Sequence, residues 1–314
     1  MTDLARANIA AAAKRIEPYI RRTPVMDLGL ATHDTPINLK LELFQHTGSF
    51  KARGAFNSVV GKSIPSAGIA AVSGGNHGAA VALAANTFGH KARIFVPGYA
   101  PAAKVALIKS YGAEIVQEGD DVAHVIGLWN DYVATTGALS IHPYDAAATL
   151  QGQATVALEW DQQTPDLDTV LVAVGGGGLI GGVAGYFNRA VKVVAVETEN
   201  TAALNLARSK GEPTNIKPSG VAADSLGANR IGNMAFAMIG NQIADSILVT
   251  DKSVLEAQRH LWNSARIVTE PGGATALAAI LSGIYQPEKG ERIGVLICGG
   301  NTDLEVFART IRAF

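Results

Sequence analysis

Short apolar runs, many of them β-branched, alternate along this chain with alanine-rich or amphipathic stretches, and this alternation constrains the fold most strongly. Most of the runs are nearly continuous in apolar residues, which is typical of strands that are buried on both faces. Six strands are predicted, at residues 69–73, 93–96, 114–117, 170–174, 192–196 and 294–297. Strands that alternate with helices predict an α/β fold with mostly parallel, open, twisted sheets flanked by helices.

Three helices are predicted with more detail. Residues 79–88 are rich in alanine and end at Gly89, which suits the position after a helix C-terminus. A second helix begins near Asp251, a candidate N-cap, and places Val254, Gln258, Leu261 and Ala265 on one face. The N-terminal segment is expected to form an alanine-rich amphipathic helix rather than a signal peptide.

Charge and cysteine content exclude several classes of function. The 26 Lys and Arg balance 27 Asp and Glu, and no basic run occurs, so neither nucleic acid nor a membrane surface is expected as a partner. The single cysteine, Cys298, excludes an intrachain disulfide and fits a reducing compartment. The longest uncharged run, residues 170–187, contains seven glycines and does not suit a membrane helix. We therefore expect a cytoplasmic protein.

The first chemical motif surrounds Lys51, in the segment Thr47-Gly48-Ser49-Phe50-Lys51-Ala52-Arg53-Gly54-Ala55. A lysine between a Gly-Ser turn and a helix is usually a surface residue. Phe50 and the small neighbours favour a partly buried amine instead. Burial lowers the pKa of a lysine and makes the neutral, nucleophilic amine available.

The second motif is Ser73-Gly74-Gly75-Asn76-His77-Gly78, between a predicted strand and a predicted helix. Backbone amides at the N-terminus of such a helix can bind an anion. A simple strand-to-helix turn with an incidental histidine explains the motif equally well.

The third motif is a run of glycines, Gly175-Gly176-Gly177-Gly178-Leu179-Ile180-Gly181-Gly182, directly after a predicted strand. Successive glycines let backbone amides converge on a phosphate. Gly176, Gly178 and Gly181 also match the dinucleotide fingerprint, with Glu197 about 20 residues beyond. The dinucleotide interpretation explains neither of the other two motifs.

Taken in order, these motifs resemble the fold-type II enzymes that use pyridoxal 5′-phosphate (PLP), a tryptophan synthase β-like fold, and specifically the threonine/serine dehydratase and serine racemase branch. The resemblance covers nearly the whole chain, because further motifs of the branch occur at the expected places. These are Arg22-Thr23-Pro24, His142-Pro143, Glu270-Pro271 and Cys298-Gly299-Gly300-Asn301.

The resemblance implies a role for each motif. Lys51 would hold PLP as a Schiff base and act as the Cα proton base. Asn76 would bind the ring hydroxyl, with Phe50 and Gly220 against the ring. The phosphate would lie on Gly175, Gly176, Gly177, Gly178 and Leu179, and the substrate carboxylate on Ser73, Gly74, Gly75, Asn76 and His77.

Cys298 would lie beside the pyridine nitrogen. A carboxylate at that position would keep the nitrogen protonated and make the ring a deep electron sink, whereas a thiol does this less well. The carbanion then expels a β-leaving group readily, which favours elimination over transamination. The implied reaction converts L-threonine or L-serine, a small amino-acid substrate, to a 2-oxo acid and ammonia.

Several alternatives stay open at this point. The racemase pattern has a serine where this chain has Gly74, which favours elimination over racemisation. Other substrates, such as 3-hydroxyaspartate or phenylserine, fit the same motifs. A nicotinamide-dependent dehydrogenase or an amino-acid sensor without turnover are the alternatives from other classes. Asp224 and Glu199 are candidate ligands for a divalent cation such as Mg²⁺, although a metal site is not evident.

His46, Tyr144 and Arg53 are three further candidates for contacts to the substrate. We interpret them as structural residues: a histidine at the rim of the pocket, a core tyrosine and an arginine on the surface of a helix.

The resemblance also implies an architecture. Residues 1–45 and 142–314 would form a large PLP-binding domain. Residues 46–141 would form a small mobile domain that carries the loop for the substrate carboxylate. Homodimers are usual in the family, so we expect a homodimer.

Overall fold

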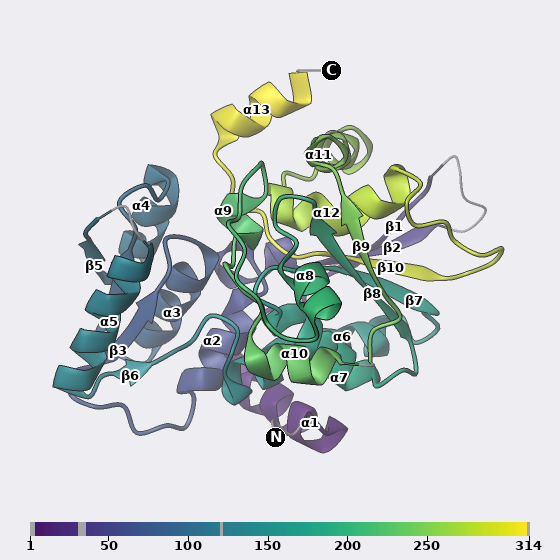
Figure 1. Cartoon of the computed structure of the whole chain (residues 1–314). Helices are drawn as coiled ribbons and strands as arrows, with labels where there is room; N and C mark the ends of the chain where they lie inside the picture. The colour runs from purple at the N-terminus through teal and green to yellow at the C-terminus, as the bar shows by residue number, and fades with distance from the viewer. Residues whose placement is uncertain (1–3, 31–35, 120–121, 241, 313–314) are drawn as a thin grey trace.

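The computed structural model describes residues 4–30, 36–119, 122–240 and 242–312, and these form two β-sheets with flanking helices (Figure 1). The strands are β1 (Val25–Leu28), β2 (Ile37–Leu41), β3 (Ile69–Val72), β4 (Ala92–Val96), β5 (Glu114–Gln117), β6 (Leu139–Ser140), β7 (Thr169–Ala173), β8 (Lys192–Thr198), β9 (Asp245–Val249) and β10 (Ile293–Ile297). One sheet has the order β1-β2-β10-β7-β8-β9 and the other β5-β4-β3-β6. Neighbouring strands run parallel except β1 and β2.

The helices fill the connections between strands. They are α1 (Arg6–Ile16), α2 (Lys51–Val59), α3 (Asn76–Thr87), α4 (Ala102–Ser110), α5 (Val122–Thr136), α6 (Ala147–Gln163), α7 (Gly178–Phe187), α8 (Ala203–Lys210), α9 (Ala223–Leu226), α10 (Asn233–Ile239), α11 (Asp251–Ala265), α12 (Pro271–Leu281) and α13 (Leu304–Arg312), with short 3-10 turns at Glu17–Tyr19, Glu42–Phe44 and His46–Gly48. None of the helices within the described ranges is long and apolar enough to cross a membrane.

Each of the six strands predicted from the sequence is present, as β3, β4, β5, β7, β8 and β10, and the mostly parallel α/β fold is confirmed. Every residue of β7 and of β10 is buried, as a continuous apolar run requires. The sequence prediction missed β1, β2, β6 and β9. These strands are short or carry polar residues, and they form through pairing with strands that are distant in the sequence.

The predicted helices are also present, with one correction. Residues of the alanine-rich segment form α3, and the N-terminal helix is α1, which buries Ile9, Ala12 and Ile16. The N-cap of α11 is Thr250 and not Asp251. The Thr250 hydroxyl accepts a hydrogen bond from the Ser253 amide at 3.1 Å, while Asp251 lies in the first turn, where an acid favours the helix dipole.

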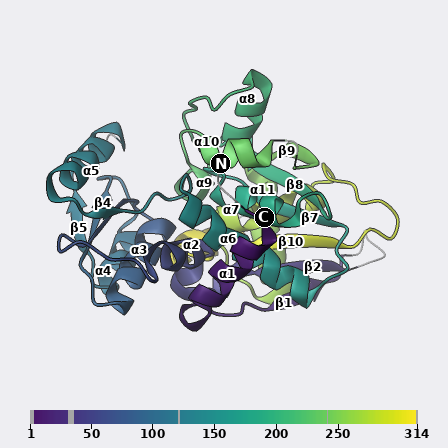
Figure 2. The ribbon, with the colours of Figure 1, turned by 90° about the horizontal axis from the view of Figure 1, so that it is seen from below.

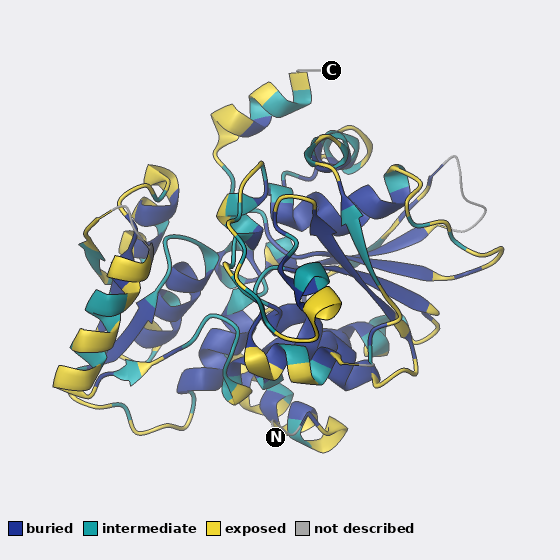
Figure 3. Ribbon diagram, in the orientation of Figure 1, coloured by how far each residue is buried: buried dark blue, intermediate teal, exposed yellow. Residues whose placement is uncertain are grey.

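Helices cover both faces of each sheet. On the six-stranded sheet, α11 and α12 lie on one face and α6 and α7 on the other. The central strands β10, β7 and β8 between them are mostly dark blue in Figure 3, whereas β9 at the edge is mostly teal. On the four-stranded sheet, α5 packs in a separate apolar cluster from α3 and α4. Helix α2 packs against both α3 and α6, and so it lies between the two sheets (Figure 2).

The topology determines where a ligand site can form. Strands β3, β7 and β10 end in the loops that carry Asn76, the glycine run and Cys298. Loops at the carboxyl ends of parallel strands are the usual place for a ligand site in open α/β sheets. The four-stranded sheet and α3 to α5 lie within residues 46–141, and the division into a large and a small mobile domain stays a prediction.

Candidate active site

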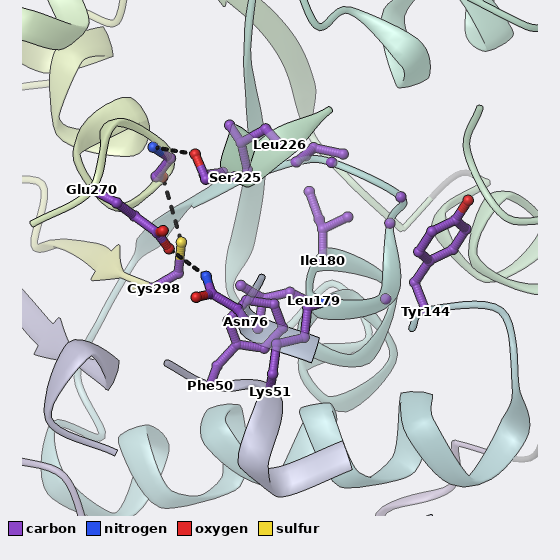
Figure 4. A pocket seen from close by; sticks show the side chains of 17 residues that line it. Phe50, Lys51, Asn76, Tyr144, Leu179, Ile180, Ser225, Leu226, Glu270 and Cys298 are labelled. Atoms are coloured by element: carbon purple, nitrogen blue, oxygen red, sulfur yellow. Dashed lines mark hydrogen bonds between the residues drawn. The ribbon is translucent and has the colours of Figure 1, made fainter. Parts of the chain in front are cut away.

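A pocket lies where the two sheets approach each other, and 17 residues line it (Figure 4). They come from the start of α2, the start of α3, the β6–α6 loop, the end of β7 with the β7–α7 turn and the start of α7, α9, the start of α12, and the residue after β10. The lining residues are Phe50, Lys51, Asn76, Tyr144, Ala173, Val174, Gly175, Gly176, Gly177, Gly178, Leu179, Ile180, Ser225, Leu226, Glu270, Gly272 and Cys298. The structure therefore brings Lys51, the glycine run, Asn76 and Cys298 together from four separate parts of the chain.

Lys51 is the first residue of α2, and its amine points into the pocket (Figure 4). Its Nζ donates a hydrogen bond to the carbonyl oxygen of Pro143 at 2.8 Å and lies 5.1 Å from the centre of the Phe50 ring. Burial lowers the pKa of Lys51 to about 8, although Cys298 and Glu270 act in the opposite direction. The amine is therefore partly neutral near neutral pH and can act as a nucleophile or a base.

The glycine run joins β7 to α7 and forms one wall of the pocket. Gly177 has a φ of +91°, a left-handed conformation that favours glycine, and no side chain caps the N-terminus of α7. A Cβ on Gly176 would collide with the Tyr144 ring. The free amides at this helix start make a fitting cradle for a phosphate group.

Cys298 follows β10 and is buried, with only 4% of its surface exposed. Burial and the nearby Glu270 raise the pKa of its thiol, so it stays protonated. The thiol donates to the carbonyl oxygen of Gly272 at 3.4 Å. A neutral thiol on the pocket wall fits the position beside a pyridine nitrogen that is not held protonated.

The predicted carboxylate loop is only partly in the pocket, because Asn76 lines it whereas Ser73, Gly74, Gly75 and His77 do not. The Ser73 hydroxyl accepts from the Gly75 amide at 3.1 Å. His77 is buried, and burial together with Lys51 lowers its pKa to about 3. Its neutral ring donates from Nε2 to the Ile141 carbonyl oxygen at 2.9 Å, so its backbone amide is better placed to bind an anion than its ring.

Two further residues contribute to the site: Glu270, to which the sequence motifs gave no role, and Lys104, which no motif includes. Glu270 lines the pocket and accepts a hydrogen bond from the Asn76 amide at 2.5 Å. Lys104 lies behind it, with its Nζ 3.3 Å from Glu270 and 2.5 Å from Asp224. The Glu270-Pro271 motif was a signal for Glu270, whereas no local pattern distinguishes Lys104 from a surface lysine on a helix.

Other candidate residues lie elsewhere. Arg53 was interpreted as a helix-surface arginine, but it is fully buried between Glu42 and Glu159. Tyr144 lines the glycine wall of the pocket, so the interpretation as a core tyrosine was wrong. Gly220 lies beside Asn200 and Asp251 outside the pocket, and Ser225 and Leu226 occupy the wall instead.

The metal interpretation gains no support from the contacts that are described. Asp224, the first candidate ligand, forms an ion pair with Lys104. Glu199, the second, lines a separate surface groove near α8. Within the described parts of the chain, no three His, Cys, Asp or Glu side chains lie close enough together to hold a metal ion.

Comparison with known proteins identifies the class. Residues 16–299 match the family described as "Pyridoxal-phosphate dependent enzyme". The chain therefore belongs to this family, and its cofactor is PLP. The uncapped glycine cradle, the amine of Lys51 and the neutral thiol of Cys298 fit this cofactor.

Individual relatives place the chain in the threonine dehydratase and serine racemase group of the family. It is 36% identical to the phenylserine dehydratase of Ralstonia pickettii, over 96% of this chain and 94% of that protein. It is 33% identical to the L-threonine ammonia-lyase of Thermotoga maritima, over 97% and 77%. The structure of maize serine racemase matches with a TM-score of 0.90 at 33% identity, over 98% of this chain and 96% of that one. The predicted family and fold type are confirmed.

The nicotinamide interpretation was wrong, and the structure gives the reason. Glu197, which would have bound a ribose, is buried, and its carboxylate accepts from the amides of Leu204 and Asn205 at 2.7 and 2.8 Å. It caps α8 instead of facing a ligand. The match of the glycine run to the dinucleotide fingerprint is therefore not accompanied by an acidic residue that could bind a ribose.

The pKa of Lys51 leads to a prediction for the cofactor-free protein. The rate of PLP capture, followed by the growth of visible absorbance, should rise about tenfold per unit below pH 7 and level off above about pH 8 to 9, because only the neutral amine reacts. A rate that keeps rising to about pH 10, as for an ordinary lysine, would contradict this assignment. The Lys51→Ala variant is the control and should show no capture at any pH.

Proposed function

We propose that this protein catalyses β-elimination from a small hydroxy amino acid, preferentially L-threonine or L-serine, and releases a 2-oxo acid and ammonia. The observation that carries the proposal is the set of basic groups around the pocket. Lys51 is the one amine among the 17 lining residues, and the Glu270 carboxylate is already held by Asn76 and Lys104. A pocket with one free base suits proton removal followed by loss of a leaving group.

Bound PLP supplies an aldehyde for covalent attachment of the amine and a ring that withdraws electrons from Cα. Lys51 removes the Cα proton. The amides of Gly175, Gly176, Gly177, Gly178 and Leu179 would hold the phosphate. Asn76 would donate a hydrogen bond to the ring oxygen, and Phe50 would contact the ring.

The substrate carboxylate binds at the start of α3, on the amides and polar groups of Ser73, Gly74, Gly75, Asn76 and His77. No side chain caps this helix, so its first amides are available for an anion. The neutral ring of His77 makes no charged contact, and the carboxylate depends on the helix start and on Asn76.

Cys298 favours elimination. Its thiol is neutral and already donates to Gly272, so it does not stabilise a positive charge on the pyridine nitrogen. Gly74 favours elimination over racemisation, because a residue without a side chain supplies no second acid for the opposite face of Cα. The racemase activity is therefore expected to be a minor one.

A second candidate substrate is phenylserine, because the relative from Ralstonia pickettii that is named for it is 36% identical over nearly the full chain. 3-Hydroxyaspartate would bring a second carboxylate and would need a cation other than Lys51. Lys104 is such a cation, but Asp224 and Glu270 already neutralise it. We therefore rank 3-hydroxyaspartate below L-threonine, L-serine and phenylserine.

The test is a substrate panel of L-serine, L-threonine, their D-forms, phenylserine and 3-hydroxyaspartate, assayed for 2-oxo acid and ammonia with and without Mg²⁺. We expect the highest kcat/KM with L-threonine or L-serine and no requirement for Mg²⁺. If phenylserine is turned over preferentially, the proposed β-elimination stands and the proposed substrate is wrong. Binding of amino acids without any 2-oxo acid would overturn the proposal.

Two features of the predicted architecture belong to the same proposal. Residues 46–141 would move as a small domain against residues 1–45 and 142–314, and would close the pocket over the substrate. Closure would exclude water from the reacting carbon. We also propose a homodimer, which light scattering in solution tests directly.

A further inference from the structure

Lys104 joins elements of both sheets at the edge of the pocket. It belongs to α4, which packs on the four-stranded sheet, and its side chain is 7% exposed. Its ammonium lies 2.5 Å from the carboxylate of Asp224 on α9 and 3.3 Å from that of Glu270 at the start of α12. The Asp224 side chain is about half exposed and that of Glu270 is buried, so Glu270 is the partner on the pocket side.

Glu270 contacts Lys104 with one carboxylate oxygen and Asn76 with the other, and we call Lys104, Glu270 and Asn76 the contact chain. Glu270 Oε2 faces Lys104, and Oε1 accepts from Asn76 Nδ2 at 2.5 Å. Asn76 Oδ1 in turn accepts from Asn301 Nδ2 at 2.7 Å. The amide of Asn76 is thus held in one orientation, with its oxygen toward Asn301 and one N–H toward Glu270. A primary amide has two N–H bonds, and the second is available to the pocket that Asn76 lines.

We propose that Lys104 is a positioning residue: it holds Glu270 as a carboxylate, and Glu270 thereby fixes the Asn76 amide with its free N–H toward the ring oxygen of PLP. The inference rests on the cofactor orientation proposed above, but it does not depend on which amino acid is the substrate. The contacts are Lys104 to Glu270 to Asn76, with Asp224 as the outer partner of the ammonium.

The burial of Glu270 explains why a cation is needed beside it. Burial raises the pKa of Glu270, and the ammonium of Lys104 and the Asn76 amide oppose that rise. Burial lowers the pKa of Lys104, but Glu270 and Asp224 outweigh it, so the ammonium stays charged. Without that ammonium, Glu270 would take up a proton, because a buried carboxylate without a partner is costly.

A protonated Glu270 would no longer fix the amide of Asn76. An ionised carboxylate only accepts hydrogen bonds, so the Asn76 group that faces it must be the NH2. A protonated carboxyl can donate, and the Asn76 oxygen could then turn toward it. The free N–H would leave the pocket, and an acceptor would face the electron-rich ring oxygen of the cofactor.

The test uses Lys104→Met and Glu270→Gln, alone and together, with Lys109→Met as the matched control. Lys109 lies on the same helix, is exposed and forms no part of the contact chain. The readouts are the visible spectrum of the holoenzyme and the affinity of the apo-protein for PLP. Neither readout needs a substrate, so failure of the proposed elimination reaction would leave the test intact.

We expect Lys104→Met to shift the visible spectrum and to weaken PLP binding about tenfold or more, as loss of a charge-assisted contact does. Glu270→Gln should have a similar effect, and the double variant should be within about twofold of Glu270→Gln alone, because both act through one carboxylate. Lys104→Arg should restore most of the affinity, and Lys109→Met should match the original protein.

Two results would overturn the proposal. One is a Lys104→Met protein with unchanged spectrum and PLP affinity and only a lower Tm, which would make Lys104 purely structural. The other is a double variant whose loss of PLP affinity equals the product of the losses in Lys104→Met and Glu270→Gln, since the two residues would then act independently. Where Lys104→Met does not fold, an unchanged spectrum of Glu270→Gln, which alters the side-chain volume little, contradicts the proposal by itself.

Discussion

Replacing Lys51 with alanine should lower kcat/KM by about 10³- to 10⁴-fold and remove the covalently held cofactor. The amine is the one free base that lines the pocket, and its pKa of about 8 suits both attachment of PLP and removal of a proton. The effect is measured from the 2-oxo acid formed with the best substrate of the panel. Loss of the visible band that is due to the bound cofactor provides an independent measurement.

Lys51→Arg is the matched variant for this prediction. Arginine keeps a positive charge and a similar length, but it has no neutral amine near pH 7. It should therefore be as inactive as Lys51→Ala while the fold is retained. Activity above about a tenth of the original in either variant would show that another group is the base.

Replacing Arg53 with methionine should destabilise the fold by about 3–5 kcal/mol, the largest stability effect that we expect from a single polar residue. Arg53 is fully buried two residues after Lys51. Its guanidinium donates to both oxygens of Glu42 at 2.7 and 2.8 Å and to Glu159 at 3.0 Å. Removal of this cation leaves Glu159 paired with Lys40, and leaves Glu42 with a hydrogen bond from the Thr23 hydroxyl but no ion pair among the contacts that are described.

Urea unfolding of the apo-protein measures this loss. Arg93→Met is the matched control, because Arg93 pairs with Glu114 on the surface of the four-stranded sheet, and such pairs contribute at most about 1 kcal/mol. An equal loss in the free energy of unfolding for the two substitutions would show that the buried network contributes no more to stability than a surface ion pair. The Arg53 variant should also bind PLP less tightly, because the network anchors the start of the helix that carries Lys51.

The six-stranded sheet shows how far local sequence patterns reach. Strands β7, β8 and β10 were predictable, because their apolar runs report burial on both faces directly. Strand β2 was not, since it carries Lys40, which is buried through an ion pair with Glu159, more than a hundred residues away. A sequence pattern within one segment cannot predict such a pair.

The candidate site likewise contains residues that local motifs predict and residues that only tertiary contacts bring into place. The residues in short, ordered motifs were predicted: Lys51, Asn76, the glycine run and Cys298 are brought together at one pocket. Lys104 and Ser225 were missed, because their positions depend on how α4 and α9 approach the pocket. Arg53 was misassigned for the same reason: its partners lie on other elements, at Glu42 and Glu159.

The most direct test of the central claim is the fate of L-serine with the purified holoenzyme in D2O, followed by chiral separation and mass spectrometry. One base at Lys51 and no side chain at Gly74 predict that pyruvate and ammonia accumulate together while the remaining serine stays in the L-form. Formation of D-serine faster than pyruvate would contradict the account, since it requires a second acid on the opposite face of Cα.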